Sequence, residues 1–210
     1  MTTVNMPAAA PVPAPAAAAA QTLLQRLLSF PPETAAADAQ AGIPAAVTAV
    51  SVLEAAAGRG RAAGCAVLPL GVQVGGDVRQ NANLHAAIAM QSLRHGRVSI
   101  PTLLLSGGSL LRAGQATGPA DFILEFAAAM DEHRAVYAYA LGVDPLTRAP
   151  IGVFLAPDTL ARARAQNLAP AAALTAGAAQ AFFSVLGNVI ALPATVAGDV
   201  VVRAVLITPD

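Results

Sequence analysis

The stretch PTLLLSGGSLLRAGQATGPADFILEFAAAM, residues 101–130, decides the fold class of this chain. Its apolar run at 102–105 predicts a buried strand, and the Ser-Gly-Gly at 106–108 predicts a turn that lets the backbone approach a ligand or another strand. A helix is expected to begin at Pro119, which suits a first helical position. Apolar side chains recur every four residues on one face of that helix: Phe122, Phe126 and Met130. The stretch therefore predicts strand, glycine turn and helix in succession.

Two interpretations of the glycine turn stay open. A strand, a glycine turn and a helix N-terminus in this order can direct backbone N–H groups at an anion. In the other interpretation the glycines only permit tight turns within a packed α/β domain. A Ser/His/Asp triad can be drawn with Ser106, but the G-x-S-x-G pattern of a nucleophile elbow does not surround it.

Strands and helices alternate on both sides of this stretch. Residues 65–72 predict a strand whose Pro69 favours a sheet edge, and Asp77 predicts the start of a helix that buries Leu84, Ile88 and Leu93. Further strands are predicted at 135–140, 151–155 and 199–208, and further helices at 43–63, 157–166 and 177–186. This alternation predicts an α/β fold, with a mostly parallel or mixed sheet flanked by helices.

Composition divides the chain into three parts. Residues 1–20 predict a disordered Ala/Pro-rich tail, because their prolines and lack of arginine do not fit a secretory signal. Residues 21–42 predict a short helix and a linker, and the leucines of this helix, QTLLQRLLSF at 21–30, are expected to dock on the core or on a partner. Residues 43–210 predict the α/β domain.

Charge and cysteine content exclude several kinds of chemistry. The formal net charge is +0, and the 12 Lys and Arg residues are all arginine. A lysine Schiff base is therefore excluded, and the scattered arginines predict no nucleic-acid partner. The lone Cys65 excludes an intramolecular disulfide. The histidine spacing predicts no metal site, and the lack of a long apolar run predicts no membrane partner and a cytoplasmic protein.

Five stretches match a known family in order and spacing: TLLLSGGS at 102–109, GPADFILEFAAAM at 118–130, GVD at 142–144, GVFLAPDTLARARAQNLAPAAAL at 152–174 and AFFSVLGNVI at 181–190. They resemble the C-terminal half, ending in the MOFRL module, of the class II glycerate 2-kinases, a family also called hydroxypyruvate reductases. The resemblance implies an α/β, MOFRL-like fold and ATP-dependent phosphorylation of D-glycerate in the cleft between two domains. Anion or substrate binding is then expected at Ser106, Gly107, Gly108, Ser109, Gly118, Asp121 and Asp144.

The chain departs from that family where the family's chemistry lies. Ser109 stands where the family has a glutamate, and residues 118–123 stand where it has G-G-R-N-Q-E. Only Asp144 remains of an acidic D-T-D-G-I-D turn, so carboxylates expected to face Mg²⁺ are lost. The closing turn is reduced to residues 195–199, and a catalytic lysine is absent. Phosphoryl transfer depends on such charges, so the resemblance implies a fold whose chemistry has been lost.

We therefore expect a degenerate or partial glycerate 2-kinase-like protein that is inactive alone, with ATP and Mg²⁺ as cofactors only if the family's activity survives. The alternative is a non-catalytic interaction or assembly module, in which the helix at 21–30 and an exposed sheet edge pair with another chain. A third interpretation is an enzyme completed by a separate chain that carries the missing lysine. The expected partner is accordingly a second copy or a complementary chain. Replacing Gly108 with valine is expected to abolish anion binding and leave the fold mostly intact.

Overall fold

The computed structural model describes residues 14–28, 45–94, 98–130, 133, 135–192 and 201–209. The strands are β1 (Ala66–Val72), β2 (Gly76–Asp77), β3 (Thr102–Gly108), β4 (Leu110–Arg112), β5 (Gln115–Ala116), β6 (Val136–Val143), β7 (Pro150–Leu155), β8 (Val189–Ala191) and β9 (Val201–Ile207). The helices are α1 (Ala14–Leu27), α3 (Ala45–Ala62), α4 (Val78–Arg94), α5 (Pro119–Met130), α6 (Thr159–Ala165), α7 (Pro170–Thr175) and α8 (Ala179–Val185). The expected caps and turns at 31–32, 95–96 and 195–199 lie outside the described residues.

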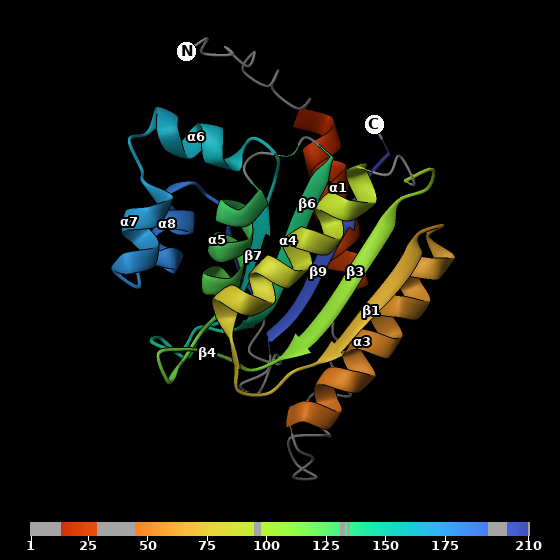
Figure 1. Cartoon of the computed structure of the whole chain (residues 1–210), viewed down its shortest axis with the longest axis horizontal. Helices are drawn as coiled ribbons and strands as arrows, with labels where there is room; N and C mark the ends of the chain where they lie inside the picture. The colour runs from red at the N-terminus through yellow and green to blue at the C-terminus, as the bar shows by residue number, and fades with distance from the viewer. Residues whose placement is uncertain are drawn as a thin grey trace.

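A six-stranded sheet in the order β1-β3-β9-β6-β7-β8 forms the centre of the molecule. Helices α4 and α5 cover one face and α1 and α3 the other, while α6, α7 and α8 gather at the β7 side (Figure 1). A small second sheet, β2-β4-β5, lies below the main one. Within the described residues, no helix is long and apolar enough to cross a bilayer.

The sheet is mixed, which confirms the predicted α/β class. Only the β1–β3 pair of the large sheet is parallel, and the β3–β9, β9–β6, β6–β7 and β7–β8 pairs are antiparallel. The mostly parallel alternative is therefore wrong, because β9 returns from the end of the chain and inserts between β3 and β6. Strand β1 lies at the edge, as Pro69 predicted, and its register shifts between Pro69 and Gly71.

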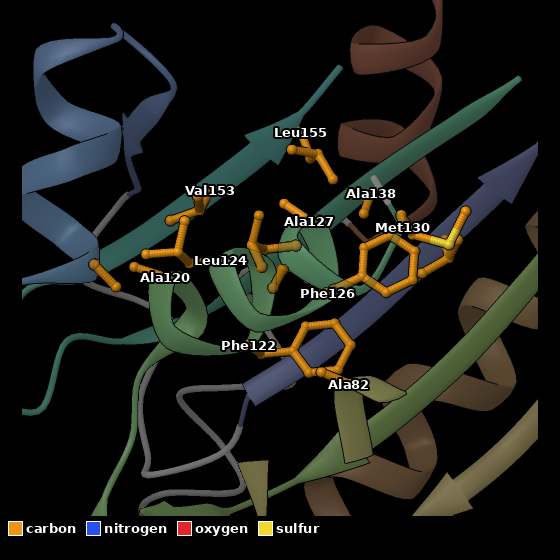
Figure 2. Packing of buried hydrophobic residues seen from close by; sticks show 14 of the residues in the cluster. Ala82, Ala120, Phe122, Leu124, Phe126, Ala127, Met130, Ala138, Val153 and Leu155 are labelled. Atoms are coloured by element: carbon orange, nitrogen blue, oxygen red, sulfur yellow. The ribbon is translucent and has the colours of Figure 1, made fainter. Parts of the chain in front are cut away.

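The predicted helix of the 101–130 stretch is confirmed as α5. It begins at Pro119, and its predicted apolar face is buried: Phe122 is 1%, Phe126 0% and Met130 4% exposed. Figure 2 shows Phe122 and Ala82 where α5 meets α4, with the alanines allowing the two helices to approach closely. This helix therefore packs beside α4 on the same face of the sheet.

Helix α1 corrects the predicted N-terminal tail. It begins at Ala14 instead of residue 21, so residues 14–20 are helical; alanine is the best helix former. Leu24, Leu27 and Leu28 are 0–2% exposed and pack with residues of α3, β3 and β9. Of the two predicted docking places for these leucines, the structure shows the core.

Helix α4 begins after Asp77, whose Oδ1 accepts a hydrogen bond of 2.9 Å from the N–H of Gln80, as expected of an N-cap. Its predicted apolar face is wrong at Leu84, which is 53% exposed. Small side chains and a histidine form the buried face instead: Val78, Asn81, Ala82, His85, Ala86 and Ala89. The alanines of α4 thus form its contact with α5, and Leu84 lies on the exposed side of the helix. Helix α7 and strand β8 were not predicted.

Candidate functional site

Strand β3 continues through Ser106, Gly107 and Gly108, so the turn predicted at these residues is wrong. The backbone does approach another segment closely here, but that segment is Gln73, the residue after β1, and not a strand: Gly108 has a φ of +110°, and a Cβ there would lie 2.7 Å from the carbonyl carbon of Gln73. The N–H of Gln73 donates to the Gly107 carbonyl oxygen over 2.9 Å. The backbone that follows β1 thus crosses directly over Gly108.

Ser106 belongs to a buried hydrogen-bond network that joins β3, α4 and β9. Its hydroxyl oxygen lies 2.8 Å from Nε2 of His85 and 3.3 Å from Nη1 of Arg203. Nδ1 of His85 lies 2.8 Å from the Asn81 carbonyl oxygen, which can only accept, so Nδ1 carries the proton. Nε2 therefore accepts a hydrogen bond from the hydroxyl of Ser106, and the oxygen of that hydroxyl accepts a second one from Nη1 of Arg203.

The imidazole of His85 is neutral at neutral pH. It is 1% exposed, and burial, with a smaller contribution from the Arg203 charge, lowers its pKa to about 4. A neutral histidine accepting from a serine hydroxyl resembles a nucleophile and its base. Ser106, however, is 3% exposed and held by Arg203, and a carbonyl instead of a carboxylate orients the ring. The triad drawn from sequence is thus a structural link between three elements.

A separate hollow of about 410 Å³ opens at the N-terminus of α5. The β4–β5 hairpin lines one side, and the turn at 174–177 between α7 and α8 lines another. Three of the seven predicted site residues line this hollow: Gly118, Asp121 and Asp144. Ser106, Gly107, Gly108 and Ser109 are not among its lining residues. The structure therefore divides the predicted site between the hollow and the buried network.

The N-terminus of α5 is closed by its own side chain. Oδ2 of Asp121 accepts a hydrogen bond of 3.0 Å from the N–H of Gly118. Arg112 reaches in from β4, with Nη1 3.4 Å from Oδ1 of Asp121 and Nη2 3.0 Å from Oε1 of Glu125. Nη1 of Arg112 also donates to the Leu174 carbonyl oxygen over 3.0 Å. A carboxylate of the chain itself therefore already accepts from one N–H at this helix end.

Asp144 is likewise engaged within the chain. It is 4% exposed, and its Oδ2 accepts from the hydroxyl of Thr147 and, over 3.0 Å, from the N–H of the same residue. With its amide nitrogen turned inward, Gln180 donates to both carboxylate oxygens over 2.7 and 2.8 Å. Asp144 thus closes a turn after β6. Among the described residues, no group of three or more His, Cys, Asp or Glu side chains could hold a metal ion.

Sequence reasoning missed the two arginines that organise these places. Arg112 follows two leucines in LLR, and Arg203 lies within the apolar strand VVRAVLI, where neither belongs to a recognisable motif. A charged residue inside an otherwise apolar strand was the available signal for Arg203, since buried charges need special partners. Glu125, the carboxylate that pairs with Arg112, was also not singled out.

Two curated proteins of Agrobacterium vitis, both named "Putative hydroxypyruvate reductase", are similar in sequence. One is 31% identical over 186 residues, which cover 83% of this chain and 42% of the relative. The other is 28% identical over 165 residues, with 74% and 43% covered. The chain therefore spans less than half the length of these relatives. No protein-family model matches the chain.

Two solved structures share the fold. A glycerate kinase of Thermotoga maritima superposes with a TM-score of 0.66 at 17% identity, over 75% of this chain and 40% of that protein. A protein of Pyrococcus horikoshii superposes with a TM-score of 0.64 at 17% identity, over 76% of this chain and 38% of that protein. The mixed six-stranded sheet with its flanking helices is thus the fold of part of a glycerate kinase.

Proposed function

We propose that the chain belongs to the glycerate kinase-like family, as a partial glycerate 2-kinase-like protein that does not phosphorylate D-glycerate alone. One observation carries the proposal: the charged groups of the hollow are already bound to other groups of the chain. Arg112 is held by Asp121, Glu125 and the Leu174 carbonyl, and Asp121 caps α5. Phosphoryl transfer needs cations positioned for the transferring group, and Arg112 is not available for that role.

The excess of negative charge around the hollow also argues against phosphoryl transfer by the chain alone. Two carboxylates, Asp121 and Asp144, and one guanidinium, Arg112, line the hollow, and Glu125 adds a further carboxylate against Arg112. An acidic wall repels the phosphates of ATP unless Mg²⁺ screens them, and the carboxylate oxygens of Asp144 are occupied by Thr147 and Gln180. The chain also has no lysine to take a phosphate.

A second candidate function is an enzyme completed by another chain. It is favoured by the match to less than half of each curated relative, which leaves room for a protein that carries the remaining part. The interaction module is supported less well, because the leucines of α1 face the core and Pro69 interrupts the exposed edge of β1. We expect the protein to act in the cytoplasm, with a complementary chain or a second copy as its partner.

The test is a coupled assay of ADP release by the purified chain with Mg-ATP and D-glycerate, beside calorimetric titration with each. A second assay, which follows NADH oxidation with hydroxypyruvate, tests for the reductase activity that appears in the names of the relatives. We expect no turnover and no heat of binding from the chain alone, with an intact two-domain relative as the positive control.

Turnover by the chain alone would contradict the proposal, provided that it depends on this hollow. The variant Arg112→Met makes that distinction, because it removes the only arginine that lines the hollow among the described residues. A rate that falls in the variant shows that the turnover depends on Arg112 and contradicts the proposal, whereas an unchanged rate shows that Arg112 of the hollow takes no part in it.

A further inference from the structure

Arg203 is a buried cation in the middle of the sheet. It lies on β9 between Ser106 of β3 and Ala140 of β6, and it is 1% exposed. Its guanidinium carbon lies 5.2 Å from the ring centroid of Phe122 on α5. Burial lowers its pKa to about 9, so the side chain is still charged at neutral pH.

No carboxylate of the described residues balances this charge. Nη2 of Arg203 donates to the Gly108 carbonyl oxygen over 2.6 Å, and Nη1 donates to the Ser106 hydroxyl over 3.3 Å. Both acceptors are neutral, and the nearby His85 is neutral as well. A buried charge is costly unless an opposite charge compensates it, and the described residues supply none here.

Two polar atoms of the same network have no hydrogen-bond partner within the described part of the chain. They are Nε of Arg203 and Oδ1 of Asn81, the residue whose carbonyl oxygen accepts from His85. Asn81 is 7% exposed, so both atoms are shielded from bulk water. Buried polar atoms are nearly always paired in native proteins, so the unpaired Nε–H of Arg203 indicates a bound acceptor, whereas Oδ1 of Asn81 is itself an acceptor and can pair only with a donor such as water.

The segment from Gln73 to Gly76 lies directly against this network. It crosses Gly108, and Oε1 of Gln73 accepts a hydrogen bond of 2.6 Å from Nδ2 of Asn81. Val74, in the middle of the segment, is 68% exposed. Two backbone hydrogen bonds hold the segment to β3 and the residue after it: Gln73 N–H to Gly107 and Gly75 N–H to Ser109. Opening these two bonds would expose the Arg203 side of β3.

We propose that Arg203 binds a small oxyanion, a carboxylate or a phosphate group, which enters where the Gln73–Gly76 segment crosses β3. The anion lies beside Ser106 and pairs with the free Nε–H of the guanidinium. The site is distinct from the hollow at Gly118, and its existence does not depend on kinase activity.

The test is thermal unfolding of the full chain in increasing inorganic phosphate or, separately, acetate, at an ionic strength held constant with sodium chloride. A ligand that binds only the folded state raises the unfolding temperature in a saturable way. We expect such a rise for the wild type and its loss in Arg203→Met. The matched control is Arg112→Met, which removes a different arginine and should retain the wild-type response. The anion that raises the unfolding temperature at the lower concentration identifies the preferred group.

A second readout separates binding from a purely structural role. Without added oxyanion, Arg203→Met should unfold at the same or a higher temperature than the wild type, because an apolar side chain of similar volume replaces an uncompensated charge. In the wild type, phosphate or acetate should change hydrogen exchange at the amides of Gln73 and Gly75, which form the two bonds of the crossing segment.

The proposal is overturned if neither anion gives a saturable rise in the wild type, or if Arg203→Met responds as the wild type does. Should the methionine variant fail to fold, Arg203→Lys retains the charge but loses the planar fork, and its affinity should fall about tenfold or more. Unchanged affinity in the lysine variant would equally overturn the proposal.

Discussion

Replacing Gly108 with alanine should destabilise the protein far more than an ordinary glycine substitution. The residue has a φ of +110°, which L side chains rarely adopt, and its new Cβ would lie 2.7 Å from the carbonyl carbon and 2.9 Å from the nitrogen of Gln73. These are backbone atoms, so no side-chain rotation relieves the contact. The segment that crosses β3 must therefore move.

The magnitude follows from two contributions. Strain at a positive φ costs about 1–3 kcal/mol for a non-glycine residue. Moving the crossing segment removes the hydrogen bonds from Gln73 to Gly107 and from Gly75 to Ser109, worth about 0.5–1.5 kcal/mol each. We expect Gly108→Ala to lose about 2–6 kcal/mol of the free energy of unfolding, a large part of the total for a domain of this size. Valine is worse, so the expectation that Gly108→Val leaves the fold mostly intact is wrong.

Urea unfolding followed by circular dichroism measures this loss, and Gly114→Ala is the matched control. Gly114 has a φ of +82° in the β4–β5 hairpin, and a Cβ at this residue would meet no other atom within 4 Å, so only strain of about 1–2 kcal/mol applies. Equal losses in the two variants would refute the argument, since the close crossing would then contribute nothing.

Two further predictions concern the buried network and helix α1. Burial lowers the pKa of His85 from 6.5 to about 4, so its contribution to stability is fully present above pH 6.5 and is lost as the pH falls toward 4. Urea unfolding at pH 7 and pH 4 measures how much the free energy of unfolding falls between these two pH values. This fall should be about 3 kcal/mol smaller in His85→Gln than in the wild type, and an equal fall in both proteins would contradict the prediction. Leu24→Ala should cost about 2–4 kcal/mol because the side chain is 0% exposed against the sheet, whereas Leu84→Ala, at 53% exposed, should cost well under 1 kcal/mol; a similar small loss in both would mean that α1 does not pack on the core in solution.

Local sequence signals predicted the elements whose formation depends on neighbouring residues. Pro119 and the apolar spacing that follows it predicted α5, and Pro69 predicted the edge position of β1, because backbone restriction and helical period act over a few residues. The mixed order of the sheet was not predictable in the same way. Strand β9 pairs with β3 at residues about a hundred positions away, as Ser106 opposite Arg203 shows.

Three of the residues predicted to bind an anion share one place in the structure. Gly118, Asp121 and Asp144 do meet around one hollow, although the interactions of their side chains were not foreseen. Ser106 and Gly108 belong elsewhere, because β3 continues straight through them instead of turning toward α5. The difference depends on hydrogen bonds to β9, which a local glycine pattern does not report.

By itself, the sequence determined which residues form α5, where the sheet has an edge, and that lysine chemistry is absent, since these depend on residue identity and short-range geometry. Only the tertiary structure decided what the chemically important residues face. It placed Gly108 under Gln73, bound Asp121 at the start of α5, and buried Arg203 with no carboxylate of the described residues beside it. Such contacts join residues distant in the chain, and their energies depend on burial and pairing that exist only once the sheet and its helices have assembled.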